Sequence, residues 1–276
     1  MITSGQESPK KRQPAVAGRF YSAQREALVR EVETYIDRNV KKSRVLGIVA
    51  PHAGLIYSGN VAGAVYSRIE IPDTVILIGP NHAGHGEEVA VMTEGTWSMP
   101  MGDICIDQEL ANAICEETVI AKQDASAHQF EHSLETQLPF LQYFKNNFKI
   151  VPICIKRINR PSCQELSEGI VRALNRYDKP VLLVASSDMT HYEPHDRATI
   201  KDRMAITCIK NRDAHGLFRT VESEKITMCG VNPVTVMLLC SEKLGATEGQ
   251  LVKYMTSGEV SGDMEKVVGY AGMIIK

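Results

Sequence analysis

The run Val45-Leu46-Gly47-Ile48-Val49-Ala50 is followed directly by Pro51 and His52. It is apolar on successive residues rather than on alternating ones, which is typical of a β-strand covered on both faces. Two later runs have the same form, and each also ends a few residues before a histidine: Thr74–Ile78 before His82, and Pro180–Ala185 before His191. The carboxyl ends of parallel strands share one edge of a sheet, so we expect these histidines to meet in one crevice.

Helical periodicity between the apolar runs predicts alternating strands and helices. A fourth buried strand is expected at Lys149–Ile155, and two paired strands near the end of the chain at Gln250–Thr256 and Glu265–Ile275, with a glycine-rich loop between them. The expected helices are Ser22–Asn39, Gly59–Ser67, Asp107–Glu116, Glu131–Phe144, Ser162–Tyr177, Asp196–Lys210 and Pro233–Leu244. This order predicts an α/β fold with a central, mostly parallel sheet covered by helices.

Length and composition favour one domain. The chain has 276 residues, of which 43% are hydrophobic, and we assign residues 15–276 to a single domain and residues 1–14 to a mobile or surface tail. The net charge is −2 and the one basic block, Lys10–Arg12, is interpreted as solvated, so nucleic acid is not an expected partner. No apolar stretch approaches the roughly 20 residues of a membrane span, and no signal peptide is recognised, so we expect a soluble, cytoplasmic protein.

The seven cysteines contain no C-x-x-C pair, which fits neither a disulfide framework nor a zinc ribbon. Three lie in apolar patterns and are expected to be small buried hydrophobes: Cys105, Cys154 and Cys240. Cys229 differs because it comes just before a predicted helix, with Asn232 as the cap and Pro233 at the first helical position. The helix amino terminus is expected to lower the pKa of Cys229 and favour its metal-binding thiolate form.

Two strand exits share one pattern of residues. Ala50-Pro51-His52-Ala53-Gly54 and Gly79-Pro80-Asn81-His82-Ala83-Gly84 each place a proline, a histidine and a glycine after a strand. Proline rigidifies the exit and glycine permits a sharp turn, so the imidazole is held at a defined position. One such histidine is usually structural, whereas two with the same flanks favour a metal site for zinc, copper or iron.

The third strand exit, Ser186-Ser187-Asp188-Met189-Thr190-His191-Tyr192, offers a carboxylate and an imidazole three residues apart. Asp188 and His191 are interpreted as a ligand pair or as an acid/base histidine with its orienting carboxylate. The alternative is an Asx-turn followed by a surface histidine. His195, a few residues further on, is expected to face solvent.

A last candidate lies at the start of the helix predicted from Glu131. A helix amino terminus suits an anionic substrate, so His132 is expected to line the site. His128 is a weaker candidate for the same role. Glu131 and Glu135 are interpreted as capping and solvated residues rather than catalytic ones.

Together these residues resemble the Memo family, the protein B component of the AmmeMemoRadiSam system. The resemblance runs almost end to end and rests on Ala17-Gly18-Arg19-Phe20-Tyr21, Pro51–Gly59, Gly79–His82, Glu131–Glu135, Ser187–Tyr192, Cys229-Gly230 and Tyr254–Gly258. It implies a fold like that of the class III extradiol dioxygenases, which are non-haem iron(II) enzymes, and an association with a radical-enzyme system.

The resemblance also implies roles for individual residues. His52, His82 and Cys229 look like metal ligands, and His191 is similar to the dioxygenase histidine that acts as acid and base. The dioxygenases use a carboxylate where this chain has Cys229. A thiolate there shifts the preference toward copper(I) or zinc.

Three hypotheses follow. The first is a redox protein that binds iron(II) or copper, with zinc as the weaker alternative, through His52, His82 and Cys229, and a dioxygenase-like oxidoreductase is its more specific form. In it, His191, oriented by Asp188, moves protons and His132 binds an anionic group of an unknown substrate. The second is a non-catalytic binding module that uses a vestigial cleft for a peptide, an anion or metal delivery. The third is metal-free hydrolysis by a Cys229–His191 pair.

Overall fold

Parallel strands form the centre of the sheet in the computed structural model of the protein, which describes residues 11–276. Their order is β6-β8-β3-β9-β2, and every neighbouring pair in this series is parallel. The bounds are Ile104–Ile106 for β6, Lys149–Ile155 for β8, Thr74–Pro80 for β3, Val181–Ser186 for β9 and Gly47–Ala50 for β2. The predicted α/β class with a mostly parallel central sheet is confirmed.

Mixed pairing extends the sheet on both sides. At one end, β12 (Val267–Ile275) runs antiparallel to β2, to β11 (Gly249–Thr256) and to β10 (His191–Glu193). At the other end, β5 (Thr96–Trp97) is antiparallel to β6 and parallel to β1 (Lys11–Arg12). Two short strands, β4 (Val89–Val91) and β7 (Ala121–Gln123), pair with each other, and β4 also pairs with β8. The predicted pairing of the last two long strands is confirmed.

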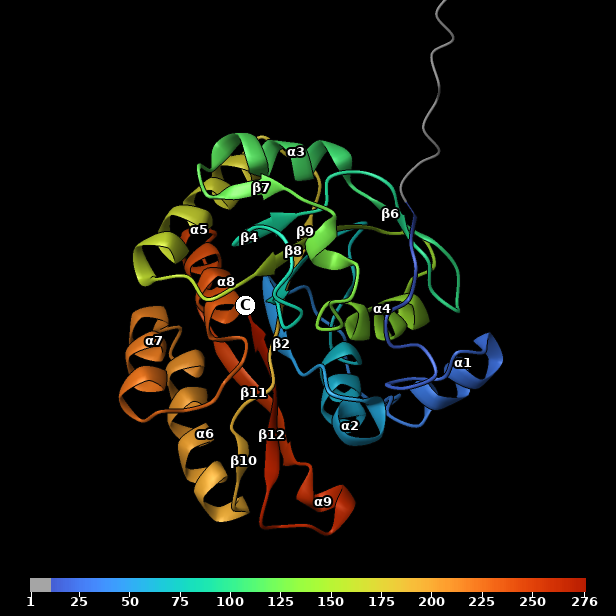
Figure 1. Cartoon of the computed structure of the whole chain (residues 1–276), viewed down its shortest axis with the longest axis vertical. Coiled ribbons are helices and arrows are strands. Elements are labelled where there is room, and N and C mark those ends of the chain that lie inside the picture. Colours follow the sequence, from blue (N-terminus) through green and yellow to red (C-terminus); the bar gives the residue numbers. More distant parts are fainter. Residues whose placement is uncertain (1–10) are drawn as a thin grey trace, which may run out of the picture.

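Helices cover both faces of the sheet (Figure 1). On one side α8 packs on β2, β3 and β9, with α5 and α7 against it; on the other, α2 packs on β2, β11 and β12, with α4 and α1 beyond. The bounds are Arg25–Glu33 (α1), Leu55–Tyr66 (α2), Gln108–Glu117 (α3), Leu138–Phe144 (α4), Arg160–Leu174 (α5), His195–Lys210 (α6), Ala214–Ser223 (α7), Val231–Lys243 (α8), Gly258–Ser261 (α9), and for the 3₁₀ turns Ser126–His128 (η1) and Glu135–Gln137 (η2). Within the described residues, no helix is long and apolar enough to span a lipid bilayer.

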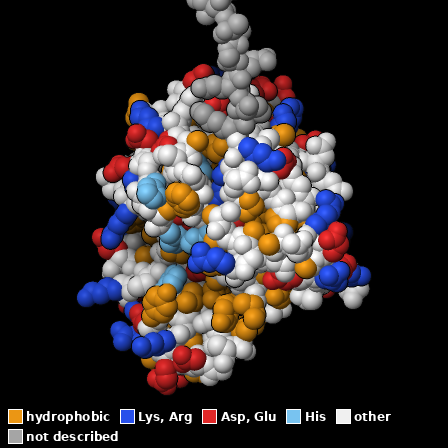
Figure 2. Space-filling view, turned by 45° about the vertical axis from the view of Figure 1, so that its right-hand side comes forward, with side chains coloured by type: hydrophobic (Ala, Val, Ile, Leu, Met, Phe, Trp, Pro, Cys, Tyr) orange, Lys and Arg blue, Asp and Glu red, His pale blue; other side chains and the backbone are white. Residues whose placement is uncertain are grey.

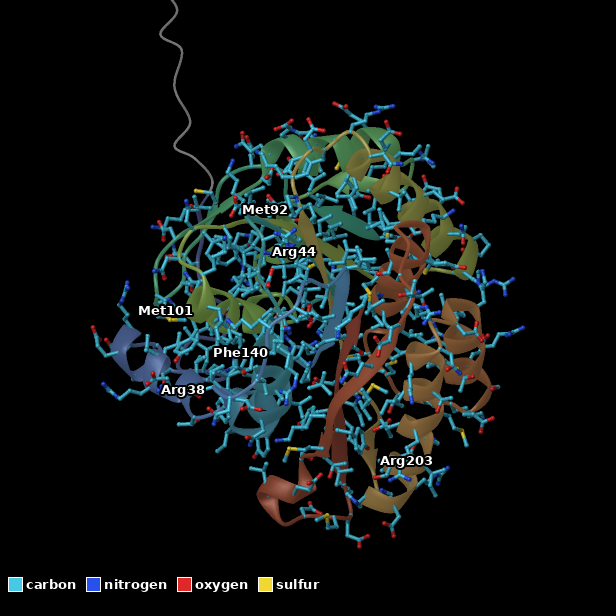
Figure 3. All side chains as sticks on the ribbon, turned by 180° about the vertical axis from the view of Figure 1, so that it is seen from behind. Arg38, Arg44, Met92, Met101, Phe140 and Arg203 are labelled. Carbon is cyan, nitrogen blue, oxygen red and sulfur yellow. The ribbon has the colours of Figure 1, made fainter. Side chains whose placement is uncertain are left out.

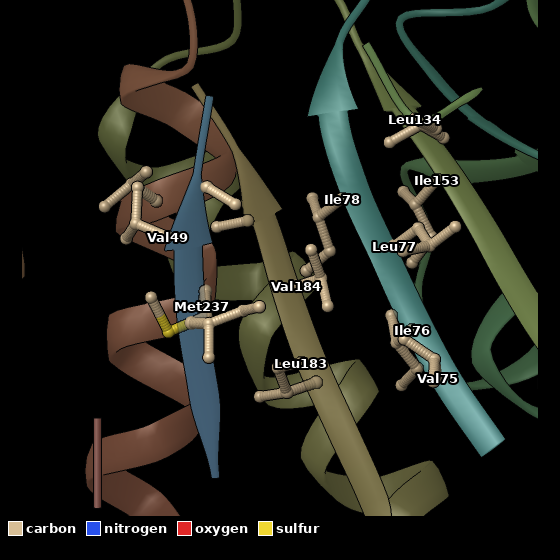
Figure 4. Packing of buried hydrophobic residues seen from close by; sticks show 14 of the residues in the cluster. Val49, Val75, Ile76, Leu77, Ile78, Leu134, Ile153, Leu183, Val184 and Met237 are labelled. Atoms are coloured by element: carbon tan, nitrogen blue, oxygen red, sulfur yellow. The ribbon is translucent and has the colours of Figure 1, made fainter. Parts of the chain in front are cut away.

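The core lies between these helices and the central strands. Every residue of β3 is buried, as its unbroken apolar run predicts, and Figure 4 shows the side chains of Ile78, Val184 and Val49 on three neighbouring strands. Helix α8 approaches so closely that a Cβ at Gly47 would lie 2.5 Å from the sulfur of Met237. Phe140, in the interior in Figure 3, stacks on Tyr66 at 5.4 Å between ring centroids. Such burial contributes about 1.5–3 kcal/mol for each large apolar side chain.

Two predictions about buried and exposed residues are wrong. Arg12, interpreted as part of a solvated block, is only 6% exposed and pairs with the buried Glu135. Lys10 lies outside the described residues. Cys105 is exposed because its side chain falls on the outer face of β6, whereas Cys154 and Cys240 are buried as expected.

Several helix boundaries differ from prediction. No helix begins at Glu131: a loop leads to η2, and α4 starts only at Leu138, because the side chain of Glu131 turns back to bind loop N–H groups. Helix α1 begins after Gln24 and ends at Glu33, well before Asn39. The predicted loop between β11 and β12 contains the short helix α9.

Candidate functional site

Three histidines meet at the carboxyl edge of the parallel strands. His52 follows β2, His82 follows β3, and His132 lies in the loop before η2. One ring nitrogen from each lies within 4.8 Å of the others, so the three imidazoles could hold a metal ion. Figure 2 shows histidine side chains gathered in a hollow on one face of the molecule. The predicted convergence of the strand-end histidines His52 and His82 is confirmed.

Hydrogen bonds fix the tautomer of His52. The hydroxyl of Ser186 donates to the carbonyl of Ser133 at 2.6 Å and accepts from Nε2 of Gln137 at 3.0 Å. Because its one proton is already used, the 2.8 Å contact between Ser186 Oγ and His52 Nδ1 requires the imidazole to donate. Nε2 of His52 therefore carries the free lone pair, and it lies 3.3 Å from Sγ of Cys229.

Glu131 fixes the tautomer of His82 in the same way. Its Oε1 lies 3.0 Å from Nδ1 of His82, and an ionised carboxylate only accepts, so Nδ1 carries the proton and Nε2 is free to bind a metal. The same carboxylate accepts backbone N–H groups of His82, Ala83, His132 and Ser133. Glu131 is fully buried, so its interpretation as a solvated residue is wrong.

Glu135 is also buried and ties the amino-terminal strand to the histidine loop. Its carboxylate accepts from the guanidinium of Arg12, from the hydroxyl of Tyr21 at 2.5 Å, and from the backbone N–H groups of Ala15 and Val16. Arg12 also donates to the carbonyl of Glu131 at 2.6 Å. The prediction that Glu135 is solvated is therefore wrong, because its buried carboxylate joins the amino-terminal strand to the loop that carries His132.

Arg12 also donates to the carbonyl of His128 at 2.9 Å, and its guanidinium lies 4.1 Å above the ring of Trp97. The imidazole of His128 is buried beside Trp97, with Nδ1 3.3 Å from Sγ of Cys154. It is not part of the histidine cluster. His128 therefore belongs to the support of the loop rather than to the site surface.

Asp188 and Cys229 lie against His52. Oδ1 of Asp188 accepts the backbone N–H of His52 at 2.8 Å, and its Oδ2 is 4.0 Å from Nε2 of that imidazole. The backbone N–H of Asp188 donates to Sγ of Cys229 at 3.3 Å. A Cβ at Gly230 would lie 2.4 Å from the carbonyl oxygen of Ser186, so only glycine lets the cysteine loop come this close.

The ionisation of Cys229 differs from prediction. Burial and the neighbouring charge of Asp188 raise the pKa of its thiol, so the expected lowering by the helix amino terminus is wrong. Helix α8 begins at Val231 after Gly230, and Asn232 is not its cap but donates to the carbonyl of Ile158. In the metal-free protein Cys229 is a thiol, and a metal ion would displace its proton.

His191 lies on β10 and is held by Thr227 rather than by Asp188. Its Nδ1 is 2.9 Å from the carbonyl of Thr227, so Nδ1 donates and Nε2 is free to accept a proton. No hydrogen bond among the described residues joins it to Asp188 or Cys229; the imidazole beside the thiol is that of His52. His195 is half-buried and bonded to Thr256 at 2.9 Å, so the expectation that it faces solvent is wrong.

Burial and neighbouring charges shift the pKa values of the clustered residues in different directions. Burial lowers the pKa of His52 well below its usual range, and also lowers that of His132. At His82 burial acts in the same direction, but the hydrogen bond and charge of Glu131 outweigh it and raise the pKa. Burial raises the pKa of Asp188. His52 and His132 are therefore neutral at pH 7, which is the form that binds metals.

The fold and the site together define a class: an α/β protein with a partly buried histidine cluster, suited to a metal ion, at the carboxyl edge of a parallel sheet. The sequence profile described as Memo-like protein matches residues 12–274. MEMO1 family proteins of Methanopyrus kandleri, Methanosarcina barkeri and Pyrobaculum aerophilum are 41%, 42% and 40% identical to this chain, covering 96%, 96% and 95% of it and 99%, 100% and 98% of their own lengths. The chain belongs to the Memo-like family.

Proposed function

We propose that the protein binds iron(II) or copper through His52, His82 and Cys229, and that zinc is a weaker alternative. The observation that carries this proposal is that Ser186 and Glu131 engage Nδ1 of His52 and His82 and leave each Nε2 free, on two imidazoles with ring nitrogens within 4.8 Å of each other. The Cys229 sulfur lies 3.3 Å from Nε2 of His52. Two imidazoles and a sulfur are donors that soft and borderline metals prefer. The third donor within 4.8 Å of the ring nitrogens of His52 and His82 is the imidazole of His132, and that group does not include the Cys229 sulfur.

We further propose a redox function, with a dioxygenase-like reaction as its finer form. Bound iron or copper would supply one-electron redox chemistry. In this proposal the protein's own groups supply the rest. Nε2 of His191, left free by the contact of Nδ1 with Thr227, would take and return a proton, and the neutral imidazole of His132 would donate a hydrogen bond to an anionic group. The reaction type rests on fold analogy.

Metal analysis tests the ligand assignment. We would purify the protein without oxygen, measure bound metals, and titrate iron(II), copper(I) and zinc into the apoprotein. His52→Ala, His82→Ala and Cys229→Ser are each expected to weaken affinity at least tenfold, and His132→Ala less. His215→Ala, an exposed histidine on α7, is the matched control and should leave affinity unchanged. Equal affinity in the first three variants and the control would overturn the site.

Oxygen consumption tests the redox proposal. The metal-loaded protein should consume oxygen with some organic substrate, and His191→Ala should slow that reaction while sparing metal affinity. Tight metal or ligand binding without turnover across a substrate collection would favour the binding module, which would use the same cleft for a peptide, an anion or metal delivery.

A further inference from the structure

A cavity of about 550 Å³ opens beside the histidine cluster. His82 and Cys229 form part of its wall, together with the end of β8, helix α7 and the loop from Lys225 into α8. A volume of this size is typical of sites for small organic molecules. A molecule bound in the cavity would therefore lie against the proposed metal ligands.

The greater part of the wall is apolar. It is made by side chains from the loop after β8, from α7, from the segment before α8 and from the first residue of α8: Ile158, Phe218, Val221, Ile226, Met228 and Val231. Phe218 and Val231 pack against the core but remain partly accessible, so part of each side chain is open to a ligand in the cavity. Burying an apolar body here would contribute about 25 cal/mol for each Å² removed from water.

The charged lining is mostly cationic. Lys156, Arg157 and Lys225 line the cavity, against one carboxylate, that of Glu222. Nζ of Lys156 donates to the carbonyl of Gly86 at 2.6 Å. The side chains of Arg157 and Lys225 make no hydrogen bond or ion pair with any residue that the structure describes. Two cations without partners at the mouth of an apolar cavity form a receptor for a negative group.

We propose that this cavity binds the substrate of the site, and that the substrate is a small organic anion: an apolar, ring-sized body carrying one carboxylate or phosphate that pairs with Arg157 and Lys225. Calling the bound molecule a substrate rests on the proposed function, because only the metal site would make that molecule react. The binding itself depends on the cavity alone. A cationic ligand would be repelled by three positive side chains. A large polar ligand would lose hydrogen bonds to water that the apolar wall does not replace.

Two fluorescent probes with the same rings test the proposal on the metal-free full-length protein. 8-Anilinonaphthalene-1-sulfonate carries a sulfonate, whereas N-phenyl-1-naphthylamine does not. We expect the sulfonate probe to bind more tightly, and Arg157→Gln and Lys225→Gln each to weaken it about fivefold while leaving the neutral probe unchanged. Phe218→Ala should weaken both probes. Arg203→Gln, on the outer face of α6 in Figure 3, is the control and should change neither.

Competition identifies the negative group. 3-Phenylpropionate and phenyl phosphate should displace the sulfonate probe better than 3-phenylpropanol. Whichever of the two anions displaces the probe at the lower concentration is the one that the cavity prefers. Equal binding of the two probes, or equal displacement by the acids and the alcohol, would overturn the proposal. Arg157→Gln should leave metal affinity intact, and His52→Ala, at a buried histidine that does not line the cavity, should leave probe binding intact. The two variants therefore distinguish a failure of the cavity proposal from a failure of the metal-site proposal.

Discussion

At the scale of single residues, Glu131 determines the geometry of the site most directly, because one carboxylate orients His82 and holds the loop that carries His132. Glu131→Gln keeps the shape but replaces one acceptor oxygen by an NH₂ group that faces N–H donors. We expect metal affinity to fall about tenfold to a hundredfold. Competition titration with a chelator measures this.

The matched control for that change is Glu168→Gln, an exposed carboxylate on α5. It should leave metal affinity unchanged. Unaltered affinity in Glu131→Gln, with both variants folded, would mean that His82 keeps its tautomer without the carboxylate.

Gly230 gives a second prediction at this scale. An alanine there would place its Cβ 2.4 Å from the carbonyl oxygen of Ser186 and from Cβ of Ser187, and neither atom belongs to a flexible chain end. We expect Gly230→Ala to lower the free energy of unfolding by about 1–3 kcal/mol and to displace Cys229. Gly54→Ala is the control, since its Cβ would meet only ordinary contacts at 3.6 Å. Equal urea midpoints for the two variants would contradict the crowding argument.

The sequence predicts the strand-end histidines but not what holds them. His52 and His82 follow buried strands, and topology alone brings such residues together. The roles of Ser186 and Glu131 depend on side-chain hydrogen bonds between segments more than 45 residues apart in the sequence, which local patterns do not encode. The available signal for Ser186 is a polar residue at the end of a buried apolar strand, since such a group requires a partner.

At the scale of elements, the amino-terminal strand β1 supports the site from a distance. Arg12 pairs with Glu135 beneath the histidine loop, and both side chains are almost completely buried. Arg12→Met would leave the carboxylate of Glu135 without its cation, so we expect a loss of about 3–5 kcal/mol in the free energy of unfolding. Urea unfolding measures it.

Lys11→Met provides the comparison in the same strand. Lys11 pairs with Asp103 at the surface, where both side chains are 46% exposed, and such pairs contribute at most about 1 kcal/mol. A similar loss in the two variants would show that burial of the Arg12 pair adds nothing.

Elements with an unbroken apolar run, or with a capping residue directly before them, are predicted best. Strand β8 has the bounds that the sequence indicates, and α3 begins directly after Asp107, which accepts the N–H of Leu110 as its cap. The predicted helix at 131–144 fails because its first residues use their polar groups on other segments, and the helix forms only from Leu138. Tertiary hydrogen bonds there override a pattern that is locally helical.

At the scale of the whole molecule, the carboxyl-terminal third closes the fold around the site. Helix α6, β10 and β11 converge on Asp202, which accepts the N–H of Thr190 at 2.9 Å and the hydroxyl of Tyr254 at 2.8 Å. A Cβ at Gly269 of β12 would lie 1.9 Å from Oδ2 of Asp202, so the sheet packs tightly on this carboxyl. This residue therefore joins the strand that carries His191 to the rest of the protein.

The carboxyl of Asp202 also makes the stability of the molecule depend on pH. Burial raises its pKa above the ordinary value of 3.8, although hydrogen bonds from Thr190 and Tyr254 oppose this. The folded state thus binds the proton more tightly than the unfolded state, so the contribution of Asp202 is largest below pH 3.8 and is lost as pH rises through the folded pKa.

Asp202→Asn removes this titration. Its carbonyl oxygen still accepts the N–H of Thr190, whereas its NH₂ group donates to the Tyr254 hydroxyl, which donates to Asp202 in the wild-type protein. We expect the stability of the wild-type protein relative to Asp202→Asn to fall as pH rises from about 4, and to become constant once Asp202 is ionised in both states. Urea unfolding of both proteins at half-unit pH steps measures the difference, and other titrating groups cancel because the two chains share them. A difference that grows with pH would mean that the hydrogen bonds to the ionised carboxylate outweigh its burial.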